Sequence, residues 1–193
     1  MSHHKLEVKK LRFSYPDGHE AVKNISFTIH HGESVGIIGA NGAGKSTLLM
    51  LMMGVLFPDE GEVLVGDVHL TKKTLPMIRQ RLGMVFQDPD DQLFMTTVYD
   101  DVAFGPRNCK LDETEVANRV QEALELVGIP QLKDRAPFKL SGGEKRAAAI
   151  ATVLSMQPDV LIMDEPTSFL DPKSRRRVMN ILNSFEHTKI ITS

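Results

Sequence analysis

The chain has a single cysteine, no apolar run long enough to cross a membrane, and almost no net charge. Cys109 has no second cysteine with which to form an internal disulfide. We therefore expect an unreactive thiol and a protein that resides in the reducing cytosol. The longest apolar run, residues 147–154, is interrupted by Thr152 and is far shorter than the ~20 residues that a membrane helix needs. A formal net charge of −2, with lysines and arginines scattered along the chain, gives no general attraction to nucleic acid. We therefore expect a protein that does not span a membrane and has no nucleic acid as its main partner.

Length and composition are ordinary for a globular domain. The chain of 193 residues is long enough to bury a sizeable core, and 41% hydrophobic and 25% charged residues are typical of soluble proteins. Residues 1–5 lack the apolar stretch of a secretory signal, and no internal repeat, low-complexity tract or flexible linker is visible. We therefore expect residues 1–193 to form one domain.

Several short segments have the patterns of β-strands. Apolar and polar residues alternate over residues 10–15 and again over residues 25–29, which predicts two strands. Residues 35–38 and 160–163 are nearly continuous apolar runs, as expected of strands buried on both faces. A last strand is predicted to begin at Ile190.

Helices are predicted between these strands. An apolar helix should follow Lys45 and end at Gly54, and a second should be capped by Asp112. A third should start at a Ser-x-x-Glu capping box at Ser141, and a fourth after Asp171. Strands alternating with helices predict an α/β fold, in which helices cover a mainly parallel sheet. We also expect an N-terminal antiparallel β portion and an inserted helical subdomain.

A glycine-rich loop lies between a predicted strand and a predicted helix, which is the context that a phosphate-binding loop requires. Its glycines let backbone N–H groups turn inward around a polyphosphate, while Lys45 reaches the outer phosphates and the Ser46 hydroxyl can ligate Mg²⁺. The loop predicts a P-loop NTPase with ATP as its nucleotide. The residues assigned to nucleotide binding here are Gly39, Asn41, Gly42, Ala43, Gly44, Lys45, Ser46 and Thr47.

Two adjacent acids follow the apolar run at residues 160–163. Asp164 should lie at the carboxyl end of a strand, where α/β sheets place their ligands, and can hold Mg²⁺ directly or through water. Glu165, one residue further on, can orient and polarise the attacking water. Two solvated acids in a turn would be the plain alternative, and the phosphate loop argues against it.

The Ser-Gly-Gly-Glu sequence at residues 141–144 has two interpretations. By itself it is a sound helix N-cap in any protein. Upstream of an Asp-Glu strand, the free N–H groups of the helix start, the Ser141 hydroxyl and the close approach allowed by Gly142 and Gly143 favour a second phosphate-binding surface. Because one ATP would already occupy the first loop, this surface implies a site completed by another subunit.

Two further side chains are candidates for the same site. Gln87 follows the apolar residues 82–86, and an amide at a strand end can sense both Mg²⁺ and the attacking water, although this signal is weak by itself. Tyr15, at the tip of the first predicted strand, could stack on an adenine ring or be a half-buried aromatic residue. We predict Glu165, Lys45 and Gln87 as catalytic residues and Ser46, Gln87 and Asp164 as metal ligands.

The order of these motifs resembles that of the ATP-binding cassette (ABC) ATPases along essentially the whole chain. Tyr15 resembles the A-loop aromatic, residues 39–47 the Walker A loop, Gln87 the Q-loop, residues 140–144 the signature, residues 160–165 the Walker B strand and residues 168–171 the D-loop. Residues 85–94, with 97–98 and 101–106, look like the ATPase subunits of energy-coupling factor importers for cobalt, nickel or vitamins.

This resemblance implies ATP and Mg²⁺ as ligands and a head-to-tail dimer of ATPase subunits, identical or mixed. It also implies a transmembrane coupling subunit, docked on the segment after Gln87, and a substrate-binding membrane subunit, with the ATPase peripheral on the cytoplasmic face of the membrane. The expected division is a core at about residues 1–87 and 158–193 and a helical subdomain at about 88–157. A non-transport ABC ATPase and a P-loop kinase are the alternatives.

The sequence departs from the family pattern at three places. Glu144 replaces the commoner glutamine and retains the capping geometry, while Phe169 is bulkier than the small residue usual in the D-loop. The family places a switch histidine after a strand such as residues 189–193, and the seven histidines here lie elsewhere. We therefore expect a truncated ATPase with slow turnover.

Overall fold

The structure, a computed structural model, describes residues 5–193, which divide into two compact units. The first unit comprises the described chain up to Leu82, together with Asp159–Asp164 and His187–Ser193. The second unit comprises Gly83–Pro158 and Glu165–Glu186.

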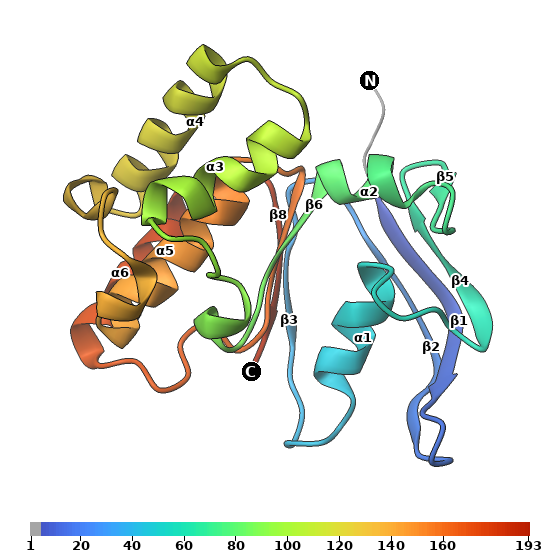
Figure 1. Ribbon diagram of the computed structural model, residues 1–193. Coiled ribbons are helices and arrows are strands. Elements are labelled where there is room, and N and C mark those ends of the chain that lie inside the picture. Colours follow the sequence, from blue (N-terminus) through green and yellow to red (C-terminus); the bar gives the residue numbers. More distant parts are fainter. Residues whose placement is uncertain (1–4) are drawn as a thin grey trace. The chain divides into compact units, whose positions relative to one another are not determined.

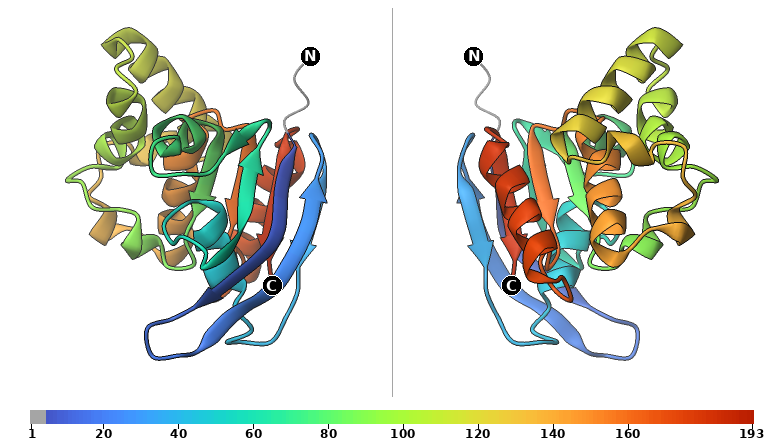
Figure 2. Two further views of the ribbon diagram at one scale, coloured as in Figure 1. Left: turned by 90° about the vertical axis from the view of Figure 1, so that its right-hand side faces the viewer. Right: turned by 90° about the vertical axis from the view of Figure 1, so that its left-hand side faces the viewer.

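The first unit contains an antiparallel sheet with the strand order β2-β1-β4-β5 (Figures 1 and 2). Its strands are β1 (Leu6–Ser14), β2 (Glu20–Ile29), β4 (Glu60–Val65) and β5 (Val68–His69). β2 contains the alternating residues 25–29, and β1 contains residues 10–14 of the segment 10–15 but ends before Tyr15. Both strands begin several residues earlier than expected. The antiparallel β portion is therefore present, and β4 and β5 were not predicted.

The first unit also contains three parallel strands that belong to a second sheet. β8 (Thr188–Thr192) pairs with β3 (Ser34–Ile37) on one side and with β7 (Val160–Met163) on the other. Ile190, opposite Ile162, is fully buried, as is typical of a strand covered on both faces. β7 has the predicted bounds, whereas β8 begins two residues before the predicted start at Ile190.

Two helices belong to the same unit. α1 (Lys45–Met52) starts directly after the glycine-rich loop and, in Figure 1, lies between β3 and the antiparallel sheet. It ends beside Gly54, whose φ of +65° is the left-handed conformation that glycine tolerates after a helix. α2 (Leu75–Arg81) was not predicted from the sequence.

The second unit is mostly helical. β6 (Leu82–Val85) leads into it, and α3 (Val98–Asn108), α4 (Glu113–Leu126) and α5 (Gly142–Leu154) pack against one another. α6 (Pro172–Ser184) packs against α5 and belongs to this unit. Three short 3₁₀ turns connect these elements, at Pro89–Asp91, Pro130–Leu132 and Pro137–Lys139.

Helix starts in the second unit follow the predicted caps. The Asp112 carboxylate accepts two backbone N–H groups at the start of α4, and the Asp171 carboxylate does so for α6. Ser141 and Glu144 form the predicted capping box of α5. α3 was not predicted, because Gly105 and Pro106 interrupt the pattern near its end.

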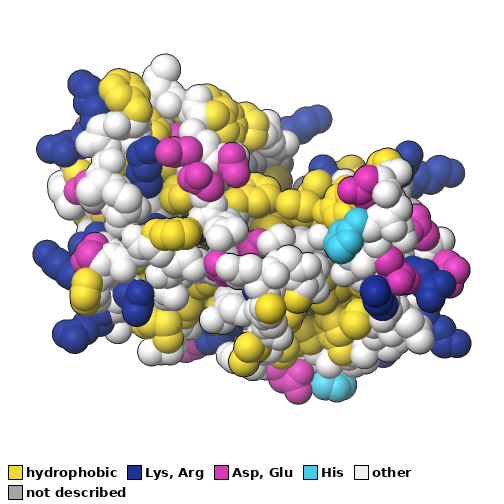
Figure 3. Space-filling view, turned by 90° about the horizontal axis from the view of Figure 1, so that it is seen from below, with side chains coloured by type: hydrophobic (Ala, Val, Ile, Leu, Met, Phe, Trp, Pro, Cys, Tyr) yellow, Lys and Arg dark blue, Asp and Glu magenta, His cyan; other side chains and the backbone are white. Residues whose placement is uncertain are grey.

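No helix within residues 5–193 is long and apolar enough to cross a membrane. Figure 3 shows acidic and basic side chains interspersed on one face of the molecule. Residues 1–4, part of the segment discussed for a secretory signal, lie outside the described residues.

Candidate nucleotide-binding site

The glycine-rich loop connects β3 to α1 and folds around its own lysine. The Lys45 Nζ donates hydrogen bonds to the carbonyl oxygens of Gly39, at 2.8 Å, and Ala40, at 3.3 Å. Gly44 has a φ of +85°, and a Cβ at this position would lie 2.2 Å from the Ala21 carbonyl oxygen of β2. Glycine is therefore required at position 44 both by the backbone conformation and by the close approach of β2.

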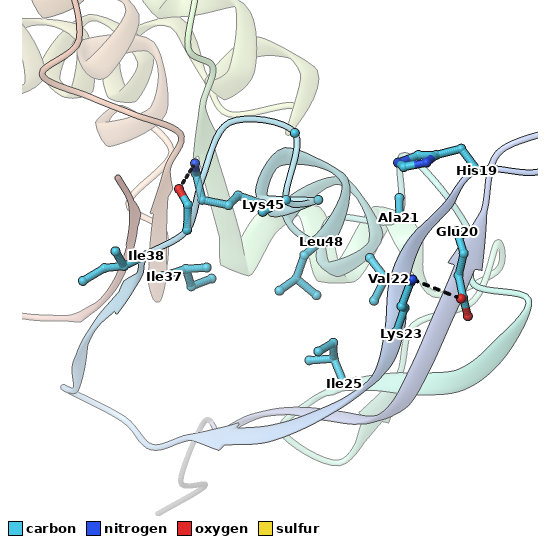
Figure 4. Close-up of a pocket in the computed structure, with 14 residues that line it drawn as sticks. His19, Glu20, Ala21, Val22, Lys23, Ile25, Ile37, Ile38, Lys45 and Leu48 are labelled. Carbon is cyan, nitrogen blue, oxygen red and sulfur yellow. Dashed lines mark hydrogen bonds and ion pairs between the residues drawn. The ribbon is translucent and has the colours of Figure 1, made fainter.

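A cavity of about 480 Å³ lies beside this loop (Figure 4). Ile25 of β2, Ile37 of β3 and Leu48 of α1 converge on its apolar side. His19 and Lys45 contribute polar groups to its lining. This volume and mixed lining are typical of small-molecule sites. The other lining residues are Glu20, Ala21, Val22, Lys23, Ile38, Gly39, Gly42, Ala43 and Gly44.

Tyr15 does not line this cavity. Its hydroxyl forms a hydrogen bond of 3.0 Å with the Thr47 hydroxyl in the first turn of α1, and its ring contacts Phe13 edge-on at 5.1 Å between centroids. These two contacts hold the tyrosine beside Thr47, which lies in the same helical turn as Lys45. Stacking of Tyr15 on an adenine ring stays a prediction.

Asp164 follows the last residue of β7 and is 5% exposed. One of its carboxylate oxygens accepts a hydrogen bond of 2.6 Å from the Thr192 hydroxyl of the neighbouring strand β8. Parallel strands end at one edge of a sheet, so this side chain lies where the sequence predicted it. Thr192 was not predicted, because no pattern within β8 indicates which hydroxyl will face Asp164.

The residues proposed as metal ligands in the first unit fit Mg²⁺. Ser46 and Asp164 supply oxygen atoms, which this hard cation prefers. No group of three or more His, Cys, Asp or Glu side chains within residues 5–193 could hold a metal ion. One carboxylate and one hydroxyl are a donor set expected for Mg²⁺ that is also bound by the phosphates of its nucleotide.

The second unit brings Gln87 and Glu165 together. The Gln87 amide donates a hydrogen bond of 3.0 Å to one Glu165 carboxylate oxygen, and the Ser168 hydroxyl donates to the same oxygen at 3.0 Å. Glu165 has a φ of +42°, a conformation uncommon for residues other than glycine. Two of the three candidate catalytic residues are thus neighbours, although the sequence alone made only a weak case for Gln87.

The start of α5 has the geometry of a capping box. The Ser141 backbone N–H and hydroxyl both donate to the Glu144 carboxylate at 2.8 Å. Hydrogen bonds from Ser141 are the main cause that lowers the pKa of Glu144 below its usual value. Replacement of the family's glutamine by Glu144 therefore preserves the cap.

The two glycines of this helix start differ in their surroundings. A Cβ at Gly143 would lie 2.0 Å from the Ser174 Oγ of α6, so packing within the chain already requires glycine there. At Gly142 a Cβ would meet no atom within 4 Å among the described residues outside its own helical turns. Of these two glycines, Gly143 is explained by packing among the described residues and Gly142 is not.

Together, a phosphate loop between β3 and α1 and a buried aspartate at the end of β7 define a P-loop nucleoside triphosphatase. The model of the ABC transporter family matches residues 22–168, and the chain belongs to this family of ATP-hydrolysing proteins. The chain is thus an ATP-binding subunit of a transporter. The matched span contains every candidate site residue except Tyr15.

Two relatives illustrate the similarity. GSU1281 of Geobacter sulfurreducens, an inferred ABC transporter ATP-binding protein, is 60% identical over 193 residues, which are all of this chain and 78% of the relative. The energy-coupling factor transporter ATP-binding protein EcfA of Methanothermobacter thermautotrophicus is 49% identical over 179 residues. That match covers 92% of this chain and 58% of EcfA.

Two solved structures share the fold. CbiO1 of Clostridium perfringens, part of the ABC transporter complex CbiONQ, is 43% identical with a TM-score of 0.87 and matches 99% of this chain and 78% of its own. The ATP-binding cassette MJ0796, as a post-hydrolysis dimer bound to ADP and phosphate, is 28% identical with a TM-score of 0.88 and matches 97% of this chain and 87% of its own. These structures confirm the predicted P-loop ABC ATPase fold.

Proposed function

We propose that this chain is the ATP-hydrolysing subunit of an energy-coupling factor importer, peripheral on the cytoplasmic face of a membrane. It energises uptake of a small solute, namely Co²⁺, Ni²⁺ or a vitamin, through a transmembrane coupling subunit and a substrate-binding membrane subunit. The observation that carries this proposal is the likeness to CbiO1, a component of a transporter complex, over 99% of the chain. The name of the EcfA relative supports the same class.

The proposed chemistry assigns one role to each motif that the sequence analysis singled out. Lys45 and the N–H groups of the glycine-rich loop hold the phosphates of ATP. Ser46, Gln87 and Asp164 hold Mg²⁺, which when bound neutralises charge on the phosphates. Glu165 orients the attacking water and accepts its proton as the water oxygen bonds to the terminal phosphorus, and ADP leaves.

A second subunit completes each site in this proposal. Ser141, Gly142 and Gly143 lie at the N-terminus of α5, a helix of thirteen residues whose first N–H groups favour an anion. The open surroundings of Gly142 allow the backbone to approach a phosphate held by another copy or by a related ATPase. The structure of MJ0796 as a dimer supports the association of two ATPase subunits.

Uptake measurements test the importer class. The chain would be purified together with the membrane subunits encoded beside its gene and reconstituted in lipid vesicles. We expect ATP-dependent uptake of one labelled solute among Co²⁺, Ni²⁺ and vitamins, and none with Glu165→Gln. ATP hydrolysis without any membrane partner that co-purifies would contradict the importer proposal and favour a non-transport ABC ATPase.

A further inference from the structure

Arg146, in the second turn of α5, is a buried arginine whose guanidinium group donates hydrogen bonds to the backbone at Phe86 and Gln87. The residue is 2% exposed, and its Nη1 donates to the carbonyl oxygen of Phe86 at 2.7 Å, while Nη2 donates to that of Gln87. No carboxylate within residues 5–193 forms an ion pair with Arg146, and its Nε has no hydrogen-bond partner there. Burial lowers the pKa of the guanidinium from its ordinary value.

The charge of the Asp88 carboxylate acts in the opposite direction and raises this pKa, but Asp88 forms no ion pair with the guanidinium. Burial of a cation without a direct ion pair is costly, and the hydrogen bonds that Arg146 donates to the two carbonyl groups offset part of that cost. The planar guanidinium donates in a fixed fork, which here matches two successive carbonyl groups. A lysine has one ammonium group without that fork. The geometry of Arg146 therefore constrains the direction in which the chain leaves β6.

The residues after Gln87 are attached to the same helix. The Gln92 amide donates to the Ala149 carbonyl at 2.8 Å and to the Thr152 hydroxyl at 2.6 Å. Lys145 pairs with Asp90 at 2.6 Å, although Asp90 is mostly exposed and this pair adds little stability. α5 thus contacts residues 86–92 at both ends of this segment, through Arg146 at residues 86–87 and through Ala149 and Thr152 at Gln92.

We propose that Arg146 is a positioning residue that fixes Gln87 from α5. The backbone of Gln87 is held by the Arg146 fork, and its side chain reaches Glu165 at 3.0 Å. A phosphate bound at Ser141, at the start of α5, would then act on a helix that also sets the Gln87 and Glu165 pair. The catalytic part of this inference rests on the proposed function, whereas the structural part does not.

Amide hydrogen exchange tests the structural part. In Arg146→Met the segment of residues 86–92 should exchange roughly tenfold faster or more, because loss of its anchors lowers the free energy of local opening. Arg146→Lys should lie between the two. Arg119→Met serves as the matched control, because Arg119 forms its ion pair with Glu115 on α4 and, within the described chain, makes no hydrogen bond or ion pair with residues 86–92, so this substitution should leave the exchange of that segment unchanged. Unchanged exchange in both Arg146 variants would overturn the proposal.

Steady-state kinetics test the catalytic part. We expect Arg146→Met to lower kcat by up to roughly 100-fold, as a small misplacement of catalytic groups can, with KM for ATP changed by less than about twofold. In a Gln87→Ala background the same substitution should cause no further loss. An equal loss in both backgrounds would show that Arg146 acts by another route and would overturn the proposal.

Two complications have defined outcomes. If Arg146→Met does not fold, as judged by its melting curve, Arg146→Lys decides both measurements. If neither this chain nor any variant hydrolyses ATP, the proposed function fails. In that case, the exchange experiment still decides whether Arg146 holds residues 86–92.

Discussion

Substitution of the two signature glycines by alanine should separate a packing role from a ligand role. In Gly143→Ala the new Cβ would lie 2.0 Å from Ser174 Oγ and 2.8 Å from Ser174 Cβ, so α5 and α6 must move apart or Ser174 must rotate. Overpacking of this kind typically costs about 1–3 kcal/mol. Rotation of Ser174 would also break its hydrogen bond to Asp171, the cap of α6. For a chain of this length, that loss corresponds to a melting temperature lower by roughly 2–12 °C.

Gly142→Ala is the matched control. Its Cβ would meet no atom within 4 Å among the described residues outside its own helical turn. Because alanine favours a helix over glycine by ~0.5–1 kcal/mol, stability should be unchanged or slightly higher. Its ATPase activity should nevertheless fall if the helix start approaches a partner's phosphate. Ser174→Gly, which removes both atoms nearest the new methyl group, should restore stability to Gly143→Ala relative to Ser174→Gly alone.

Calorimetric melting curves of Gly142→Ala, Gly143→Ala, Ser174→Gly and the Gly143→Ala/Ser174→Gly double variant test the packing role of Gly143. If Gly143→Ala melts at the same temperature as Gly142→Ala, the close contact with Ser174 does not limit the packing of these helices. If Gly142→Ala hydrolyses ATP normally, that glycine has no role toward a partner nucleotide, and the dimer proposal loses its structural support.

Three further substitutions test individual site residues. Lys45→Ala should weaken ATP binding by ~1.5–3 kcal/mol because it removes a charge-assisted phosphate contact, and equal affinities in calorimetric titration would remove the basis of the assignment. Glu165→Gln keeps size but loses the charge, so ATP should bind while hydrolysis falls and an ATP-bound dimer accumulates on gel filtration; a monomer with normal turnover would exclude Glu165 as the base. Thr192→Val removes the hydroxyl that donates to Asp164, so a higher Mg²⁺ concentration should be needed for half-maximal ATP binding, whereas Thr192→Ser should behave as the unmodified chain. Identical Mg²⁺ titrations of the valine and serine variants would show that this hydrogen bond does not orient the carboxylate.

The sequence by itself determined the features that depend on neighbouring residues. The phosphate loop, the capping box at Ser141 and the strand β7 are each specified by a contiguous pattern, because the chemistry of a turn, a cap or a buried strand is local. For the same reason, the positions of Lys45 and Asp164 at the ends of their elements could be predicted. α3 could not, because a glycine and a proline near its end contradict the helical pattern, and packing against α4 and α5 stabilises it instead.

Contacts between distant segments were decided only by the tertiary structure. Gln87 meets Glu165 across 78 positions, and Thr192 meets Asp164 across 28. Arg146 reads in the sequence as one more charged residue of a helix, yet it is buried against two carbonyl groups that no local pattern connects with it. Such pairs are set by how strands and helices pack against one another, and the period of a sequence specifies which face of an element is buried but not which residue that face will meet.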